Sequence, residues 1–418
     1  MFRFIHAADL HLDSPLHGLR SFEGAPVERL RAAPRRALEN LVDFAIEQQV
    51  SFVVIAGDLF DGDWKDYGTG QFFVRQMAKL KEHAIQVFLI SGNHDAQNKM
   101  SRALAYPSNV QVFETDKPNT KTIDSLEIAI HGQGFANQSV TIDLSASYPP
   151  RIKGWINIGL LHTSCTGREG HENYAPCTIE GLKSHGYDYW ALGHIHKREV
   201  LLQDPWIIFP GNIQGRHAKE TGPKGCYLIT VDEHRQLHPT FHPLDDLRWE
   251  NLPVDLRNAE SLDDIQGLFA RELESLLANS HDKLLAIRIN LQGQTPLHRS
   301  LRPEYERIFQ ECQATATGIA RDSVWIEKIE INTSLPKEIS NENEPVNEEV
   351  LGAILNVLEQ AKQDPSLLSS FSMNDVRSKL PRTARNPSTD AFLDPSPQLL
   401  EWAKERLVEV LSGEVPTK

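Results

Sequence analysis

Five short polar clusters, each directly after an apolar run, carry side chains that could bind metal ions. They are Asp9-Leu10-His11, Gly57-Asp58-Leu59-Phe60-Asp61, Gly92-Asn93-His94-Asp95, His162 and Gly193-His194-Ile195-His196. Carboxylates, imidazoles and an amide are ligands for Mn²⁺, Fe²⁺ or Zn²⁺, and the lack of cysteine in the clusters argues against a structural zinc site. A single histidine beside a strand is more often a capping or core residue, but five clusters in series favour a metal centre.

The apolar runs before these clusters predict the elements that position them. β-Branched and aromatic residues predict buried strands over residues 2–7, 52–56, 87–90, 156–161, 189–192 and 227–231. Apolar residues at helical spacing predict helices over 34–48 and 70–83. Strands that alternate with helices indicate an α/β sheet, which binds its ligands at the carboxyl ends of the strands. The five clusters should therefore converge at one edge.

The composition excludes some classes of protein. The chain has 418 residues with 43 Lys+Arg against 57 Asp+Glu, and its formal net charge of −14 excludes a polybasic nucleic-acid binder. The N-terminal apolar run is too short for a signal peptide, because Arg3, His6 and Asp9 interrupt it. No segment has the ~18 apolar residues of a membrane span, and the four cysteines form no CxxC pair. We therefore expect a cytoplasmic protein that has no membrane partner.

The sequence divides into three expected regions, of which residues 1–245 contain all five clusters. Residues 246–337 predict a small α+β capping module, with helices over 260–279 and 303–313 and strands over 284–291 and 324–331. Residues 338–418 begin with an acidic linker, whose positions 338–349 hold five Glu and no basic residue, and continue with apolar helical stripes at 350–361 and 400–411. These stripes would either bind a partner helix or pack on the first domain.

The order of the clusters resembles the calcineurin-like metallophosphoesterase superfamily, whose motifs are D-x-H, G-D-x-x-D, G-N-H-D/E, H and G-H-x-H. The resemblance covers residues 2 to about 232. It implies an α/β/β/α fold, in which a β-sandwich is flanked by helices, and two divalent cations, with Mn²⁺ favoured and Fe²⁺ or Zn²⁺ as alternatives. In the family pattern one cation would be held by Asp9, His11, Asp58 and His196, and the other by Asp58, Asn93, His162 and His194. Two such cations activate water for attack on phosphorus and neutralise charge on the phosphoryl oxygens.

The same resemblance assigns roles to two residues that are not metal ligands. His94 would face the substrate and either protonate the leaving oxygen or stabilise its charge. Asp61 would orient His94, and a solvated loop aspartate is the alternative for this position. Nuclease relatives from archaea and eukaryotes usually carry His at the position of Asp61, whereas the bacterial SbcD-type enzymes carry Asp.

Within the superfamily, the chain is most similar to the bacterial DNA-repair exonuclease branch, the SbcD-like proteins, and particularly to the YhaO type. The similarity rests on the segments FIHAADLHLDSPL, GDLFD and FPGNIQGRHAKETGPKG. In the last segment, Asn212, Arg216, His217 and Lys219 lie among glycines, where the backbone can approach a phosphate closely. These four residues are expected to contact the phosphates of DNA, and a plain glycine-rich turn is the alternative.

We therefore expect a two-metal phosphodiester hydrolase, a DNA exonuclease that acts in DNA repair. Two cations add +4 locally, and Arg216, Lys219 and Lys224 make one segment basic, so DNA could bind locally despite the net negative charge. The resemblance implies a coiled-coil SMC-like ATPase as partner, and a homodimer is compatible with it. A small-molecule phosphodiesterase or phosphatase would use the same site, and a regulatory subunit of an ATPase complex is a further alternative.

Overall fold

The computed structural model describes residues 1–12, 26–61, 67–97, 104–166, 174–278, 283–336 and 356–357. Residues Met1–Ser334 form one structural unit. The predicted linker and helices of 338–418 lie outside the described residues except for 356–357, and they stay predictions. None of the helices in the described ranges is long and apolar enough to cross a membrane.

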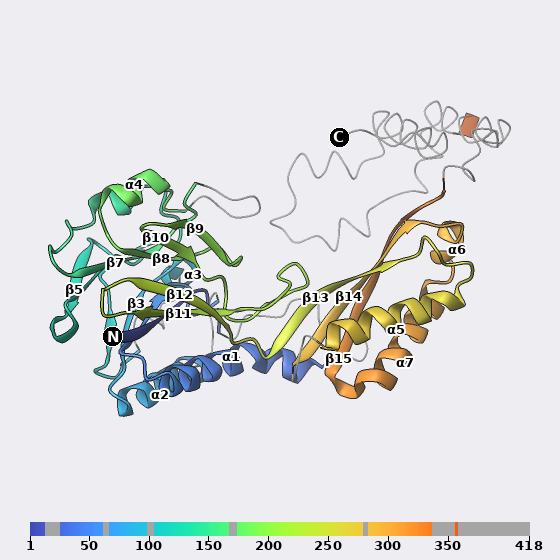
Figure 1. The fold of residues 1–418 in the computed structure, drawn as a ribbon, viewed down its shortest axis with the longest axis horizontal. Coiled ribbons are helices and arrows are strands. Elements are labelled where there is room, and N and C mark those ends of the chain that lie inside the picture. The colour runs from blue at the N-terminus through green and yellow to red at the C-terminus, as the bar shows by residue number, and fades with distance from the viewer. Residues whose placement is uncertain are drawn as a thin grey trace. The chain divides into compact units, whose positions relative to one another are not determined.

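The first sheet contains the strands that precede the first three polar clusters (Figure 1). Its strand order is β12-β11-β1-β2-β3-β4. The bounds are β1 Phe2–Ala7, β2 Phe52–Ala56, β3 Gln86–Ile90, β4 Val110–Val112, β11 Gly225–Val231 and β12 Leu237–Pro243. Strands β1 to β4 are parallel, whereas β11 pairs antiparallel with both β1 and β12. The carboxyl ends of β1, β2 and β3 therefore meet at one edge of the sheet.

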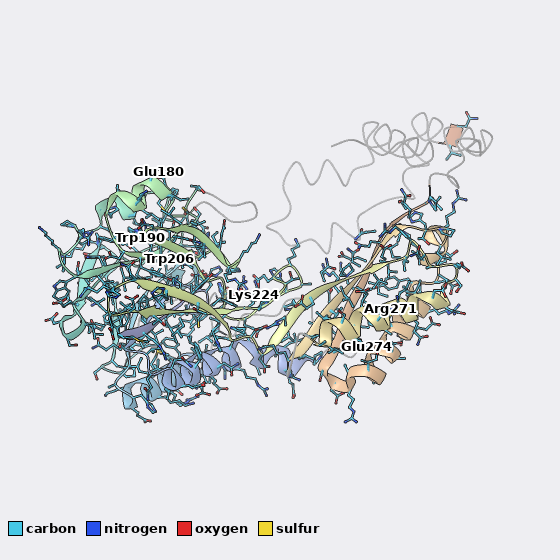
Figure 2. All side chains as sticks on the ribbon, viewed as in Figure 1. Glu180, Trp190, Trp206, Lys224, Arg271 and Glu274 are labelled. Carbon is cyan, nitrogen blue, oxygen red and sulfur yellow. The ribbon has the colours of Figure 1, made fainter. Side chains whose placement is uncertain are left out.

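The second sheet contains the strands that precede the last two clusters, in the order β5-β6-β7-β8-β10-β9. The bounds are β5 Asn119–Ile123, β6 Ile128–Gly132, β7 Ile156–His162, β8 Tyr189–Gly193, β9 Glu199–Gln203 and β10 Trp206–Phe209. Strands β6, β7, β8 and β10 are parallel, and the edge strands β5 and β9 are antiparallel to their neighbours. Trp190 of β8 is fully buried in this sheet and donates its indole N–H to Leu182 O of helix α4, Ile179–Ser184 (Figure 2).

The two sheets pack face to face, and helices cover their outer faces. Leu38 of helix α1, Val27–Glu47, packs with Val53 of β2 and with helix α2, Tyr67–Glu82, on the first sheet. Phe4 of β1 and Ile158 of β7 belong to the apolar core between the sheets. Helix α4 lies on the outer face of the second sheet. The expected α/β/β/α architecture is therefore confirmed.

A third sheet of three parallel strands follows, in the order β13-β14-β15. Its elements are β13 Leu247–Asp255, α5 Asp263–Ala278, β14 Leu284–Gln294, α6 His298–Leu301, α7 Tyr305–Ala320 and β15 Val324–Ser334. Parallel neighbours need a crossover connection, and α5 and α7 supply it. Phe269 of α5 and Ile308 of α7 are buried against this sheet. Arg271 and Glu274 of α5 are exposed (Figure 2).

Helix α1 begins earlier than predicted, and its first turns have a packing role. The prediction starts the helix at Pro34, at the beginning of the stretch with apolar helical spacing, whereas the structure places Pro34 inside α1. The extra turns carry Leu30 and Ala33, which pack in one apolar cluster with Trp249 and Trp325 of the third sheet. The helix start therefore depends on a tertiary contact that its local sequence does not signal.

Gly193, the last residue of β8, permits a close approach of the two sheets. A Cβ at this position would overlap the carbonyl oxygen of Ala56 at the end of β2. We predict that Gly193→Ala lowers the free energy of unfolding by at least ~1–3 kcal/mol, because overpacking a closed core forces the backbone to move. Thermal or urea unfolding of the purified variant measures this change.

Gly267→Ala is the matched control, because Gly267 lies in the exposed middle of α5 and a Cβ there meets no atom within 4 Å. This variant should be more stable than the parent by ~0.5–1 kcal/mol, since alanine loses less backbone entropy in a helix. A Gly193→Ala protein as stable as the parent would contradict the close approach.

Candidate metal centre

The polar clusters meet where the parallel strands end. Asp9 and His11 follow β1, Asp58 follows β2, Asn93 begins helix α3 (Asn93–Gln97) after β3, His162 ends β7, and His194 and His196 follow β8. All of these side chains are buried except that of His196, which is 14% exposed. The structure thus brings together every residue that the sequence analysis assigned as a metal ligand.

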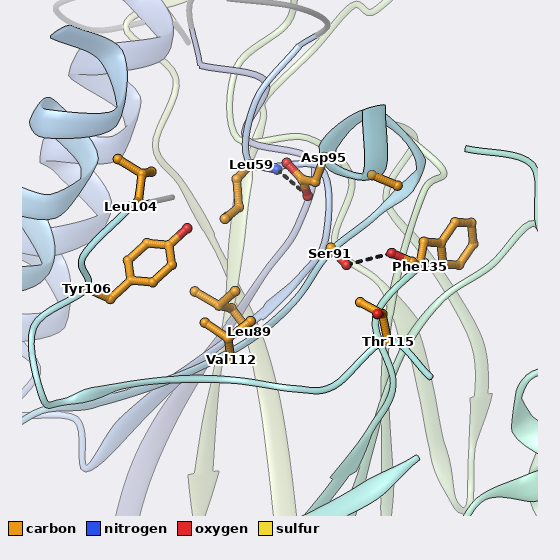
Figure 3. Close-up of a pocket in the computed structure, with 10 residues that line it drawn as sticks. Leu59, Leu89, Ser91, Asp95, Leu104, Tyr106, Val112, Thr115 and Phe135 are labelled. Carbon is orange, nitrogen blue, oxygen red and sulfur yellow. Dashed lines mark hydrogen bonds between the residues drawn. The ribbon is translucent and has the colours of Figure 1, made fainter. Parts of the chain in front are cut away.

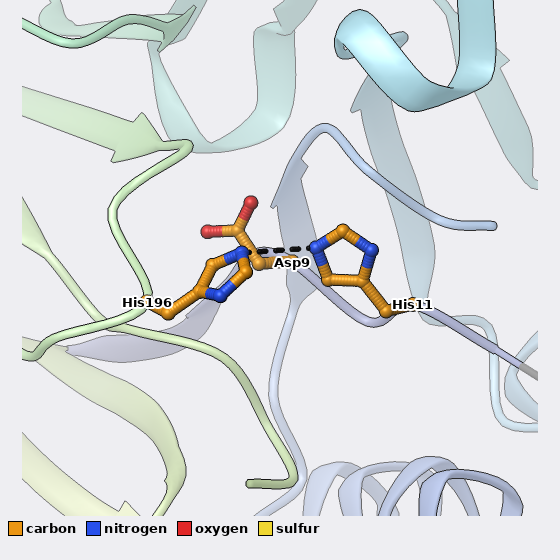
Figure 4. A group of neighbouring side chains, drawn as sticks. All are labelled: Asp9, His11 and His196. Carbon is orange, nitrogen blue, oxygen red and sulfur yellow. Dashed lines mark hydrogen bonds between the residues drawn. The ribbon is translucent and has the colours of Figure 1, made fainter. Parts of the chain in front are cut away.

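Two sets of these side chains present their ligand atoms to one another. Atoms of Asp9, His11 and His196 lie within 4.8 Å of one another, and so do atoms of Asp58, His162 and His194. In the first set, the Nε2 atoms of His11 and His196 lie 3.0 Å apart (Figure 4). The second set is extended by Asn93, whose Oδ1 lies 2.9 Å from Nε2 of His162.

Asp58 belongs to the second set and also reaches the first. Its Oδ2 atom is 3.8 Å from Nε2 of His11 and 3.5 Å from Nε2 of His162. Its other oxygen accepts the backbone N–H of His94 at 3.0 Å. This is the position that a carboxylate shared by two cations would need.

Four of the predicted ligands have a positive φ, a backbone conformation that residues other than glycine rarely adopt. The φ angles are 51° at Asp9, 43° at His11, 51° at Asp58 and 100° at His194. Positive φ in residues other than glycine is costly, persists where the surroundings enforce it and clusters at functional sites. The backbone after β1, β2 and β8 is therefore held in a form that aims these side chains inward.

The donor chemistry fits a pair of divalent cations. Buried carboxylate oxygens and imidazole nitrogens are ligands for Mn²⁺, Fe²⁺ and Zn²⁺. The buried Nδ1 of His11 has no hydrogen-bond partner among the described residues, and its Nε2 faces another imidazole nitrogen instead of a donor or acceptor of complementary type. A cation between His11 and His196 would satisfy both Nε2 atoms.

The electrostatics of the centre follow from burial. Burial raises the pKa of Asp9 to about 6, although nearby histidines oppose this change. Burial alone would also raise the pKa of Asp58, but the charge and hydrogen bond of His162 hold it well below its usual range. In turn, burial alone would lower the pKa of His162, but Asp58 outweighs it and raises that pKa to about 9. Asp58 is thus negative at neutral pH.

His94 differs from the ligands in exposure and in its partner. Its side chain is 34% exposed, and its Nδ1 lies 2.9 Å from Oδ1 of Asp61. This hydrogen bond raises the pKa of His94. The other oxygen of Asp61 accepts an N–H of Arg216 at 3.1 Å. Asp61 therefore lies against His94, as the sequence analysis expected, and is itself held by Arg216.

Asp95 joins the loops that carry two of the predicted ligands, a role that the sequence analysis did not assign. Its carboxylate accepts the backbone N–H groups of Leu59, Phe60 and Gly92 at 3.0–3.1 Å. Burial and the charge of Asp58 raise the pKa of Asp95 to about 7. The same carboxylate borders a cavity of about 290 Å³, whose lining includes Tyr106 and Phe135 (Figure 3).

The four residues expected to contact DNA phosphates have different surroundings. Asn212 is fully buried and donates its amide hydrogens to Gln214 O and to Glu220, which favours a structural role. Arg216 binds Asp61, as described above. His217 and Lys219 are exposed. Phosphate contacts by these residues stay predictions.

Glu220 contacts the centre, although the sequence analysis did not single it out. Its Oε1 lies 2.7 Å from Nδ1 of His196, and the charge and hydrogen bond of His196 hold the pKa of Glu220 below its usual range despite burial. Lys224 donates to the backbone carbonyl of His196 at 3.2 Å. No local spacing marks Glu220, because it reaches His196 only when the segment after β10 folds back.

That segment also holds the start of the third sheet. Gln214 accepts the backbone N–H groups of Asp246 and Leu247, and the indole N–H of Trp249 donates to Gly215 O. The backbone N–H of Gly222 donates to Trp249 O. The segment therefore lies between the candidate centre and β13.

Comparison with known proteins shows the protein family to which this chain belongs. Residues 2–198 match the family described as calcineurin-like phosphoesterase, and residues 249–334 match the middle domain of metallophosphoesterase YhaO. With the two-sheet fold and one relative at 35% identity, these matches show that the chain belongs to the calcineurin-like metallophosphoesterases, a family of hydrolases.

Two relatives and one solved structure are similar to parts of this chain. The relative at 35% identity is the uncharacterized metallophosphoesterase YhaO of Bacillus subtilis (strain 168), matched over 297 residues, which are 70% of this chain and 72% of that protein. The DNA double-strand break repair protein Mre11 of Methanopyrus kandleri is 25% identical over 255 residues, 56% of this chain and about half (52%) of that protein. A dimetal phosphatase from Danio rerio has a TM-score of 0.32 at 12% identity, covering 56% of this chain and 93% of that one.

Asp58 should be the ligand whose loss affects both cations. We predict that the parent protein binds two Mn²⁺ ions per chain and that Asp58→Ala loses tight binding of at least one, because Oδ2 lies within 4 Å of histidines in both sets. Elemental analysis after desalting and calorimetric titration with Mn²⁺ measure the stoichiometry.

Asp43→Ala, which removes an exposed carboxylate of α1, is the control and should bind Mn²⁺ like the parent. Two ions bound by Asp58→Ala with the affinity of the parent would contradict the bridging position.

Proposed function

We propose that this chain is a metal-dependent phosphodiesterase that cleaves DNA. The observation that carries the proposal is the meeting of buried carboxylates and imidazoles beside His94, a partly exposed histidine held by Asp61. Membership of the phosphoesterase family supports hydrolysis of phosphate esters. Similarity to a relative described as a DNA double-strand break repair protein supports DNA as the substrate.

The proposed roles of the residues follow the two sets of side chains. Asp9, His11, Asp58 and His196 would hold one divalent cation, proposed to be Mn²⁺, and Asp58, Asn93, His162 and His194 would hold the other. When bound, such a pair lowers the pKa of water and neutralises charge on phosphoryl oxygens. The chain's own part is to hold these ligands rigidly, and the enforced φ angles of the loops favour this.

His94 would act on the leaving group. Its Nδ1–H donates to Asp61, which fixes the ring and leaves Nε2 as the nitrogen that exchanges a proton with substrate. As the bond between phosphorus and the leaving oxygen breaks, this nitrogen would give its proton to that oxygen. General acid catalysis of this kind contributes typically ~10²–10⁴-fold in rate.

Local positive charge would compensate for the net charge of −14. Lys197 and Lys219 are exposed on the segments that carry His196 and Glu220. Phosphate contacts by such side chains position a nucleic acid without reading its sequence. Binding should therefore weaken as the salt concentration rises.

The direct test is hydrolysis of several substrates by the purified protein with Mn²⁺. We expect shortening of single- or double-stranded DNA that EDTA and Asp58→Ala abolish. Cleavage of bis-p-nitrophenyl phosphate and of nucleotides without any cleavage of DNA would overturn the proposal in favour of a small-molecule phosphodiesterase.

His94→Ala should separate proton donation from metal binding. We predict a loss of ~10²–10⁴-fold on DNA and a smaller loss on bis-p-nitrophenyl phosphate, whose leaving group needs no proton. Steady-state rates on the two substrates measure the difference.

Metal content is the control for this variant. It should stay at the parent level if His94 is no ligand, because the hydrogen bond to Asp58 is made by the backbone N–H of His94, although its ring also lies within 4.8 Å of ligand atoms of His11 and Asp58. Equal losses on both substrates would argue against the acid role.

A further inference from the structure

The two ring nitrogens of His196 face different surroundings. Nε2 points to the candidate centre and lies 3.0 Å from Nε2 of His11. Nδ1 points the other way, to Oε1 of Glu220 at 2.7 Å. The carboxylate of Glu220 is almost completely enclosed, with its side chain 9% exposed. A buried carboxylate thus lies directly behind one predicted ligand.

Glu220 is itself held in place by donors. Its Oε2 accepts the amide N–H of Asn212 at 2.9 Å and the backbone N–H of Arg216 at 2.7 Å. Both partners can only donate in these contacts, so each requires an acceptor at Oε2. The position of Oε1 against His196 is therefore fixed before any ligand binds.

Arg216 offers a competing contact that the geometry disfavours. Its Nη2 lies 3.3 Å from Nδ1 of His196 and could donate only to a ring that lacks a proton on Nδ1. Glu220 can only accept, and its contact with the same nitrogen is shorter, at 2.7 Å. The protonated Nδ1 is therefore favoured.

We propose that Glu220 is a positioning residue that holds His196 in the tautomer with hydrogen on Nδ1, so that the lone pair of Nε2 faces the metal. The proposal rests on the metal centre of the proposed function. His162 offers a parallel, because its Nδ1 donates to Ala56 O at 2.8 Å while its Nε2 faces Asn93. Partners of this type fix ring orientation, and their removal typically weakens metal binding about 10–100-fold.

The first experiment observes the tautomer in the full-length protein without metal. Long-range ¹H–¹⁵N spectra of protein labelled at histidine distinguish a protonated Nδ1 from a protonated Nε2, and comparison with His196→Gln assigns the signal. We expect Nδ1–H at His196 in the parent and a shift toward Nε2–H in Glu220→Gln, because the new amide can donate to Nδ1. A parent protein with Nε2–H at His196 would overturn the proposal without any variant of Glu220.

The second experiment measures Mn²⁺ binding by calorimetric titration. Glu220→Gln should weaken one of two sites about 10–100-fold and leave the other unchanged, because Glu220 contacts only His196 among the predicted ligands described. The control is Glu327→Gln, which alters a carboxylate of similar exposure, 10%, that is paired with Arg288 in the third sheet. Both sites should keep their affinity in that variant.

Two outcomes would reject the role of Glu220. One is unchanged affinity at both sites, and the other is an equal loss at both sites with a fall in melting temperature, which would indicate a merely structural residue. These readouts do not involve DNA. The parent protein could fail to cleave DNA and still show the expected tautomer, with Glu220→Gln losing Mn²⁺ affinity at one site. That result would reject DNA as the substrate and support the positioning role of Glu220.

Discussion

The buried negative charge of Asp58 is the constraint on which the centre depends. An unpaired carboxylate away from water is strongly unfavourable. Here the rings of His11 and His162 and the backbone N–H of His94 surround it, and these groups come from the ends of β1, β7 and β3. Removing one partner of a buried charge typically costs ~3–5 kcal/mol. A shift of any of these strand ends away from Asp58 would therefore destabilise the fold. The packing of the two sheets and the electrostatics of the site therefore depend on each other.

The glycines that precede the ligands have a steric explanation. A Cβ on Gly57 would lie 2.5 Å from Nδ1 of His162, one on Gly92 would overlap Asp58, and one on Gly193 would overlap Ala56. Each glycine removes an atom from the space that a ligand or an adjacent strand end occupies. Close approach around the centre thus explains the glycine in each of the G-D, G-N and G-H motifs.

The sequence predicted the strands that carry the ligands because each is a continuous apolar run that ends in a polar cluster. It did not predict edge strands such as β5 and β9, whose residues are only partly buried and lack a clear pattern. It also missed Glu220, because this residue lies in a glycine-rich segment without periodicity and meets His196 only through tertiary folding. The same folding pairs Arg216 with Asp61, a contact that the expected phosphate role did not include.

The hydrogen bonds between the segment after β10 and the start of β13 have a consequence for local unfolding. To open, the segment that carries Glu220 must release Asp246 and Leu247 from Gln214 and break its bonds with Trp249. Regions that must break the same bonds tend to open together as one cooperative unit. Strand β13 thus stabilises the hydrogen bond between Glu220 and His196 against local unfolding, although it supplies none of the predicted metal ligands.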